Sequence, residues 1–340
     1  MESPRATPGS RRARRRARPR RRALLYISLA TVAVLGVTAA GTVYVKAHAR
    51  DGGPVSSAAS PTPSAPSSSS SSSSSASANG EASVEPVTEP AVDRDALLST
   101  AMETVTVPSG AKVSAAVLDL DSGDSAAYGE AAFDTASIVK VDILATLLLQ
   151  AQDAGRHLTA TEKAYATKMI QNSDNTSASE LWDTIGKAAG LDTANKRFGL
   201  TDTEGGDGAL WGLTQTTAAD QLTLLQQVFG DDSKLSEASR SYLQGLMKTV
   251  ESDQRWGVSA AADGSGFALK NGWLARSSTG LWDVNSIGRV TVAGTDYLVA
   301  VLSKGTVSQA KGISLVEAAA KAAVRSFTAA DSSASASASQ

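Results

Sequence analysis

The feature that most limits how this chain folds is an apolar run at residues 141–149, interrupted only by Asp142 and Thr146. A run of this length predicts a helix that is buried inside the domain. The preceding residues 134–140 (DTASIVK) supply its start, because Asp134 or Thr135 is a good N-cap. Ser137 is then expected in the first helical turn, where free N–H groups and the helix dipole stabilise a developing negative charge.

Ser137 and Lys140 have the spacing of a serine nucleophile and its base. Side chains three residues apart on a helix share one face. A serine hydroxyl needs a base within hydrogen-bond reach, and a lysine can be that base when burial and nearby cations lower its pKa. The same spacing recurs at residues 109–112 and 308–311, so an ordinary helix lysine and an ordinary cap serine remain alternatives at this point.

The amino-acid composition narrows the chemistry. The chain of 340 residues has no cysteine, which excludes disulfides, thiol catalysis and cysteine metal ligands. It has two histidines, His48 beside an apolar N-terminal segment and His157 in a predicted loop. A solvated histidine is the simpler interpretation of His157. A Ser-His-Asp triad is therefore not expected, a lysine base gains weight, and no metal or cofactor is predicted.

The N-terminal region has the pattern of a membrane anchor. Residues 1–49 hold ten arginines and Lys46 against Glu2, although the whole chain has a net charge of −2. We expect residues 1–22 to form a basic cytoplasmic tail and the uncharged apolar residues 23–45 to span the membrane. The alternative is a signal segment cleaved near Ala49, which would release a secreted protein.

The charge distribution bears on partners. Outside its first 49 residues the chain is acidic, so the arginines are interpreted as targeting, and nucleic acid is not an expected partner. Residues 21–25 also loosely fit a twin-arginine export signal.

Two segments have too little apolar surface to fold. Residues 46–92 are rich in Ser, Ala and Pro, with an unbroken serine run at 67–75, and Ala-Ser repeats fill residues 329–340. We expect both to be disordered, the first as a flexible linker that spans on the order of 35 Å. The folded part is then residues 93–328, which we expect to be a monomeric ectodomain.

Hydrophobic periodicity and turn signals divide the folded part into helices and strands. The order is helix, two strands, a helical block, three strands and a closing helix. This order predicts an α+β fold with one antiparallel five-stranded sheet built from both ends of the domain and a helical subdomain between them. Helices are predicted at 95–104, 137–155, 160–171, 177–187, 193–198, 218–229, 236–250 and 314–327, and strands at 112–120, 125–129, 267–273, 282–292 and 297–303.

A second candidate motif lies between two predicted helices. Residues 171–175 read QNSDN, in which Ser173 can relay a proton between a lysine and a leaving group and Asn175 can bind a substrate amide. The alternative is structural, because Ser173 or Asp174 would cap the following helix.

A third candidate motif lies in a predicted strand. Lys270 there can bind a substrate carboxylate, and Gly272 lets the backbone approach a ligand closely. The alternative for Lys270 is an edge-strand lysine that prevents aggregation.

The order of the three motifs, S-x-x-K, then S-D-N, then K-x-G, resembles that of class A β-lactamases and penicillin-binding proteins over residues 93–328. The resemblance implies a β-lactamase-like fold. It also implies roles, by which Ser137 is acylated, Lys140 is the base and Ser173 passes a proton to the leaving nitrogen. Substrate contacts would come from Asn175, Lys270, Asn271, Gly272 and Trp273. The backbone N–H groups of Ser137 and Trp273 would together form the oxyanion hole.

The chain departs from the family pattern in three ways. Asn271 replaces the usual threonine of K-T-G, so its amide would donate to the substrate carboxylate in place of a hydroxyl. The segment between the first two motifs is shorter than usual, which predicts a more open cleft. The family's loop glutamate, which activates the deacylating water, has no clear counterpart. Glu204 matches by position only, and a solvated glutamate in a glycine-rich loop is the favoured interpretation.

These observations favour an extracytoplasmic, membrane-tethered serine hydrolase that acylates Ser137 with a β-lactam or a related amide. The first alternative is a penicillin-binding D-Ala-D-Ala peptidase-like protein with slow deacylation. The second is a catalytically silent module that binds cell-wall peptide. The sequence does not identify the natural substrate.

The membrane topology can be tested directly. The arginine-rich start before residues 23–45 predicts that the folded domain lies outside the membrane. Protease added to cells with opened walls but intact membranes should therefore remove the domain. A domain that survives this treatment, while a known external protein is digested, would contradict the topology.

Overall fold

The five-stranded antiparallel sheet predicted from the sequence is confirmed. The structure, a computed structural model, describes residues 92–337. The strand order is β2-β1-β7-β6-β5, so the first hairpin of the domain pairs with the last strand of the chain and β5 is an edge strand. The strands are β1 (Lys112–Asp119), β2 (Ser125–Tyr128), β5 (Phe267–Ala275), β6 (Trp282–Val292) and β7 (Thr295–Thr306).

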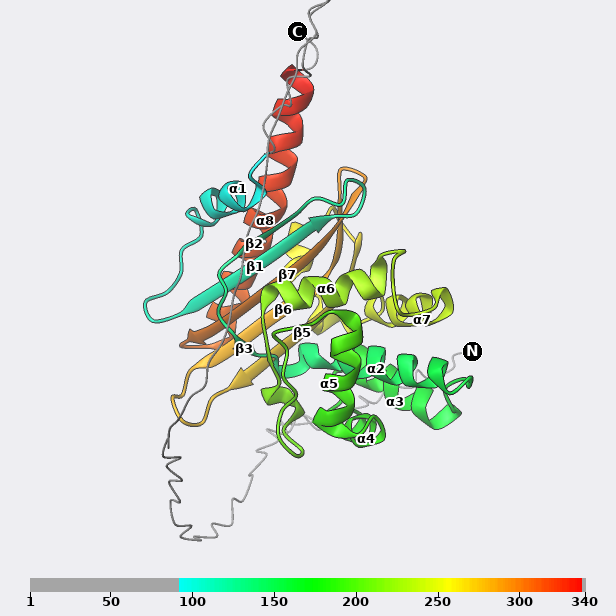
Figure 1. Ribbon diagram of the computed structural model, residues 1–340. Coiled ribbons are helices and arrows are strands. Elements are labelled where there is room, and N and C mark those ends of the chain that lie inside the picture. Colours follow the sequence, from blue (N-terminus) through cyan, green and yellow to red (C-terminus); the bar gives the residue numbers. More distant parts are fainter. Residues whose placement is uncertain (1–91, 338–340) are drawn as a thin grey trace, which may run out of the picture. The chain divides into compact units, whose positions relative to one another are not determined.

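One face of the sheet is covered by the first and last helices of the domain, α1 (Arg94–Met102) and α8 (Gln309–Ser337), which pack together (Figure 1). The Phe327 ring of α8 lies edge-on to the Tyr297 ring of β7, at 6.2 Å between centroids. The helix continues past its predicted end to Ser337 and so replaces the disorder predicted for residues 329–337. Alanine, which has the highest helix propensity, is frequent there.

Helix α6 (Ala218–Phe229) packs on the opposite face of the sheet. The helical part of the domain lies on this same side (Figure 1). The central helix α2 (Val139–Asp153) is buried along nearly its whole length, as its sequence predicts. The helices around it are α3 (Ala160–Gln171), α4 (Asn175–Thr184), α5 (Lys187–Phe198) and α7 (Glu237–Met247).

Most helix starts follow from capping side chains. Asp174 accepts from the backbone N–H of Ser177 and starts α4, whereas Thr159 and Glu162 form a capping box at α3. The predicted bounds 177–187 and 193–198 are wrong, because Gly186 at φ +90° ends α4 and α5 begins at once.

The predicted cap at the start of the central helix is also wrong. Neither Asp134 nor Thr135 caps it with a side chain, and the buried Thr135 hydroxyl has no hydrogen-bond partner among residues 92–337. The chain instead enters α2 through a short strand β3 (Phe133–Asp134) and a 3₁₀ turn η1 (Ala136–Ile138). Strand β3 pairs with β4 (Gln215–Thr216), and this pairing fixes the backbone ahead of Ser137.

The predictions for the N-terminal tail, the membrane segment and nearly all of the linker fall on residues 1–91, which lie outside the described part. Within residues 92–337, no helix is both long and apolar enough to cross a membrane.

A buried polar pair joins the central helix to α5. Asn195 Nδ2 donates to Asp142 Oδ2 at 3.0 Å, and both residues are about 1% exposed. The other oxygens, Asp142 Oδ1 and Asn195 Oδ1, have no partner in the described structure. The pKa of Asp142 is raised to about 7, mainly by burial, which outweighs the lowering effect of the hydrogen bond from Asn195, and to a smaller extent by the carboxylates of Asp192 and Asp220. A protonated Asp142 would donate to Asn195 Oδ1 and satisfy both oxygens, so the pair is best satisfied as acid and amide.

Asp142→Asn should therefore stabilise the protein above neutral pH. With its pKa raised from its ordinary value, Asp142 holds a proton longer in the folded state, so its contribution to stability falls between about pH 4 and 7. The loss is up to about 4 kcal/mol. Thermal unfolding from pH 5 to pH 8 should show the advantage of the variant growing with pH. Exposed Asp253→Asn is the control, and an equal advantage at every pH would contradict the argument.

Candidate active site

Ser137 lies in a backbone turn, residues 134–138, that is held from three sides. Asn285 of β6 donates through Nδ2 to the carbonyl oxygens of Asp134 at 2.9 Å and Thr135 at 3.0 Å. The Thr135 N–H donates to the Thr214 carbonyl at 2.9 Å. Ala136 takes a left-handed φ of +48°, which turns the next residue, the half-buried Ser137, out of the helix line.

The carboxylate of Asp134 ties the same turn to two other segments. It accepts from Arg276 Nη1, just beyond the end of β5, and from Gln215 Nε2 of β4. Arg276 also lies 3.9 Å from Asp283 of β6. The turn that carries Ser137 is thus fixed by side chains on β4 and β6 and next to β5.

Strand β5 touches the Ser137 turn at Gly272. A Cβ at this position would lie 2.7 Å from Ser137 N and 2.8 Å from both Ile138 N and Thr135 O, so only glycine fits. As β5 is an edge strand, its outward N–H groups are free of strand partners. This close approach brings the backbone of Trp273 to the side of Ser137, as an oxyanion hole made of these two N–H groups requires.

Lys140 is fully buried, one helical turn beyond Ser137. Its Nζ donates to Ser173 O at 2.7 Å, to Ser173 Oγ at 3.1 Å and to Asn175 Oδ1 at 2.8 Å. The ring of Trp211 lies 4.9 Å from the same nitrogen. The three N–H bonds of an ammonium group are therefore all used.

Lys270 reaches the same hydroxyl from the sheet. Its Nζ donates to Ser173 Oγ at 3.0 Å and to Asn271 O at 2.8 Å, and the side chain is fully buried. Ser173 has a left-handed φ of +55°, which is uncommon for a serine. The structure therefore brings Lys140, Ser173, Asn175 and Lys270 together from separate parts of the chain, and Ser137 lies one helical turn before Lys140, with its backbone nitrogen against Gly272.

The two buried lysines favour their neutral forms. Burial lowers the pKa of Lys140 to about 7, opposed only by the Asp174 carboxylate. Burial also lowers the pKa of Lys270 well below its ordinary value, and the neighbouring Lys140 lowers it further. At neutral pH a sizeable fraction of Lys140 is therefore an amine, which can accept a proton.

Asn271 is turned away from this group. Its Nδ2 donates to the carbonyl oxygens of Gln254 at 2.7 Å and Trp256 at 2.9 Å, and the residue is 1% exposed. Both amide protons are thus used by backbone, which leaves no donor for the substrate carboxylate that the sequence assigns to it.

Glu204 lies apart from the lysines. Its backbone forms an isolated bridge with Gln215, and its exposed side chain lines a cavity of about 410 Å³ with Glu130 and Thr217. Ser137 and Lys140 do not line that cavity. Among the described residues, no carboxylate is hydrogen-bonded or ion-paired to Ser137, Lys140, Ser173 or Lys270.

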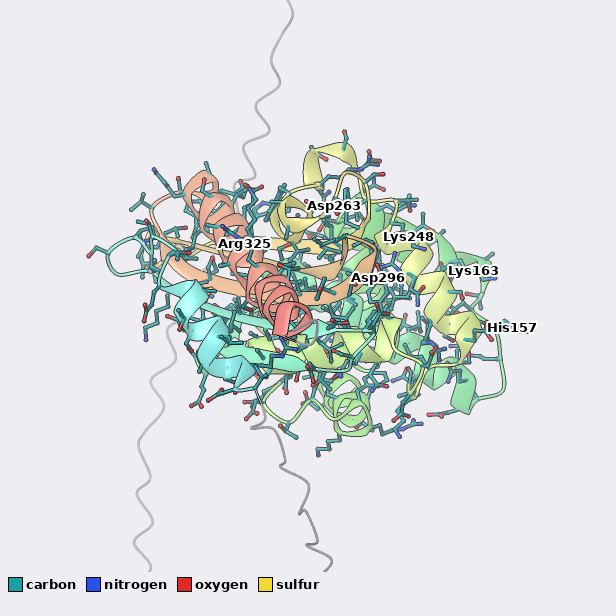
Figure 2. The ribbon with its side chains drawn as sticks, turned by 90° about the horizontal axis from the view of Figure 1, so that it is seen from above. His157, Lys163, Lys248, Asp263, Asp296 and Arg325 are labelled. Atoms are coloured by element: carbon teal, nitrogen blue, oxygen red, sulfur yellow. The ribbon has the colours of Figure 1, made fainter. Side chains whose placement is uncertain are left out.

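The histidine considered in the sequence is remote from the site. Figure 2 shows His157 at the outer edge of the helical part, near Lys163, and its side chain is exposed. Within the described residues, no group of three or more His, Asp or Glu side chains is arranged to hold a metal ion.

Sequence reasoning missed the residues that position the turn. Asn285, Arg276 and Gln215 act through contacts with residues far away in the chain. A signal existed for Asn285 alone, since it is a polar residue in the middle of a predicted strand.

The comparison with protein families gives a definite result. The model of the beta-lactamase enzyme family matches residues 149–327, which is more than half of the 340 residues. The chain therefore belongs to the beta-lactamase enzyme family, and it is a β-lactamase-like serine hydrolase. The matched part contains Ser173, Asn175 and Lys270, whereas Ser137 and Lys140 precede it. No curated protein matches the sequence.

Solved structures share the fold. PBP-A is similar with 22% sequence identity and a TM-score of 0.59, over 68% of this chain and 96% of its own. A class A beta-lactamase from Bacteroides cellulosilyticus has 14% identity and a TM-score of 0.59, over 69% and 99%. At such identities the likeness shows the β-lactamase-like α+β fold only.

The contact at Gly272 can be tested by adding one methyl group. Gly272→Ala should destabilise the protein by about 1–3 kcal/mol, because the methyl would meet backbone atoms that cannot move aside. Gly245→Ala is the matched control. Nothing lies within 4 Å of a Cβ there, and the exposed position inside α7 predicts a gain of roughly 1 kcal/mol. Equal unfolding temperatures for both variants would contradict the close approach.

Proposed function

We propose that the protein is an extracytoplasmic penicillin-binding serine hydrolase that acylates Ser137 and releases the acyl group slowly. One observation carries the proposal. A hydrogen-bonded set of lysine, serine and lysine adjoins Ser137, and no carboxylate within the described residues contacts it.

Acylation needs the groups that lie beside Ser137. The Ser137 hydroxyl oxygen attacks the carbonyl carbon of the amide, and its proton moves to the neutral amine of Lys140. Deprotonation frees a lone pair on Nζ while two N–H bonds remain to hold Ser173 and Asn175. The lowered pKa of Lys140, about 7, supports this role at neutral pH.

The leaving nitrogen must then receive a proton. The Ser173 hydroxyl touches both lysines, so it can pass a proton from Lys140 to the nitrogen as the C–N bond breaks. An anionic group of the substrate would favour the protonated form of Lys270, which would then bind it, and the N–H groups of Ser137 and Trp273 would stabilise the oxyanion. Asn175 would orient the substrate amide in this scheme.

Deacylation has different needs. A water molecule must attack the ester and give up a proton, and a positioned base typically speeds such a step roughly 10²–10⁴-fold. Glu204 is exposed and lines a separate cavity, which supports slow release. An acyl-enzyme that forms faster than it is hydrolysed is typical of a penicillin-binding protein. True β-lactamase turnover is the alternative, and a base at Glu204 would produce it.

We further propose that residues 23–45 anchor the domain at the extracytoplasmic side of the cell membrane and that residues 46–92 let it reach cell-wall peptide. The charge pattern of the sequence supports this arrangement. A β-lactam resembles a strained amide of such a peptide, so both substrates are assigned to the same serine. A solved mutant of PBP-A is described as an acyl-enzyme complex with penicillin G, which supports a β-lactam as the first probe.

Time-resolved intact-protein mass spectrometry with a penicillin tests the proposal. We expect one product equivalent per protein in a burst, a long-lived adduct, and a much slower steady state. Ser137→Ala should form no adduct, while the fold is kept. Glu204→Gln should leave the slow rate nearly unchanged. Fast turnover without a burst that collapses in Glu204→Gln would identify a β-lactamase instead, and no adduct at all would refute acylation by this probe.

A further inference from the structure

The loop between α5 and β4 places one aromatic ring against the catalytic lysine. Trp211 begins a 3₁₀ turn, η2 (Trp211–Leu213). This turn packs on the Ser137 turn, since a Cβ at Gly212 would lie 3.9 Å from Ala136 Cα. The loop is tied down at its end, where the Thr214 carbonyl accepts from Thr135 N at 2.9 Å.

The orientation of the Trp211 ring is fixed. Its centroid lies 4.9 Å from Lys140 Nζ, within the range of a cation–π contact. Its indole N–H donates to Ser179 Oγ of α4 at 3.2 Å. The half-buried ring also packs against the hydrophobic core around α2. The ring is therefore held between two helices beside Lys140.

The surroundings of Lys140 are then filled. Its three N–H bonds point to oxygens of Ser173 and Asn175, and the Trp211 ring covers it from the loop. An indole ring offers no acceptor for a proton, because its one nitrogen is a donor. The ring therefore offers no base to a water molecule on this side.

From this geometry we infer that Trp211 is the positioning residue that makes the acyl-enzyme long-lived, by keeping an activated water away from the loop side of the ester. The inference rests on the proposed acylation of Ser137. In the step that it slows, the water oxygen bonds to the acyl carbon and the bond to Ser137 Oγ breaks. One water proton goes to a base and Ser137 Oγ takes up a proton.

Substitutions of Trp211 separate the effects of bulk and of a base. Trp211→Leu keeps an apolar side chain in place and should leave release as slow as in the wild type. Trp211→Ala opens the space and should speed release, though by less than a positioned base would. Trp211→Glu puts a carboxylate beside Lys140 and should speed release by roughly 10²-fold or more. All three should still be acylated, so the rates of acylation and release change separately.

The control lies next in the chain. Leu210 is 55% exposed, so Leu210→Ala should change neither rate. Ser179→Ala removes the acceptor of the indole N–H and should loosen the ring with a smaller acceleration. This variant also replaces Trp211→Ala in the test if the latter does not fold.

The readout is the decay of the penicillin adduct, followed by mass spectrometry on folded protein checked by circular dichroism. The inference is supported if the adduct decays fastest in Trp211→Glu, less fast in Trp211→Ala, and at the wild-type rate in Trp211→Leu. Normal acylation with unchanged decay in the Glu, Ala and Ser179→Ala variants would overturn it and leave the proposed function standing. If the wild type forms no adduct, acylation by this probe is refuted first and the inference falls with it.

Discussion

The hydroxyl of Ser173 joins the two halves of the site. It accepts from Lys140, which belongs to the helical part, and from Lys270, which belongs to the sheet. Within residues 92–337 neither lysine is hydrogen-bonded or ion-paired to a carboxylate, and both are fully buried. Buried cations are costly unless they are paired or neutral, so the pKa of each lysine falls instead. The burial of both lysines where the halves meet thus also makes a proton acceptor available near neutral pH.

This arrangement explains why the fold needs a rigid sheet edge. Lys270 and Gly272 lie on β5, whose position relative to Ser137 is set by the Arg276 side chain on Asp134 and by Asn285 on the turn carbonyls. A shift of β5 would alter both the contact of Lys270 with Ser173 and the backbone N–H groups around Ser137. Acyl transfer depends strongly on such positioning, because a displacement of about 1 Å can reduce a rate by as much as 10²-fold.

Much of this could be predicted from the sequence, because the relevant signals are local. Alternation and turn residues predicted five strands, and the apolar run predicted the central helix. The order of the three motifs, through its resemblance to the β-lactamase family, predicted which side chains meet. The entry into α2 was mispredicted, because β3–β4 pairing and Asn285 override the local capping preference of Asp134. Trp211 and the backbone carbonyls that occupy Asn271 depend on loops whose paths no short pattern specifies.

The backbone conformations at the site follow the same logic. Ala136 and Ser173 are two of the four non-glycine residues with positive φ in the described part of the chain. A left-handed backbone costs about 1–2 kcal/mol for such residues, so it persists only where surrounding contacts dictate it. Asn285 holds the two carbonyls just before Ala136, those of Asp134 and Thr135, and Lys140 holds the carbonyl and hydroxyl of Ser173. The buried lysine therefore does more than accept protons, since its ammonium form also keeps Ser173 in a conformation that serine seldom adopts. Loss of the proton removes one of the three hydrogen bonds that Lys140 Nζ donates. The charge of Lys140 is thereby linked to the geometry of Ser173, the group to which it must pass a proton.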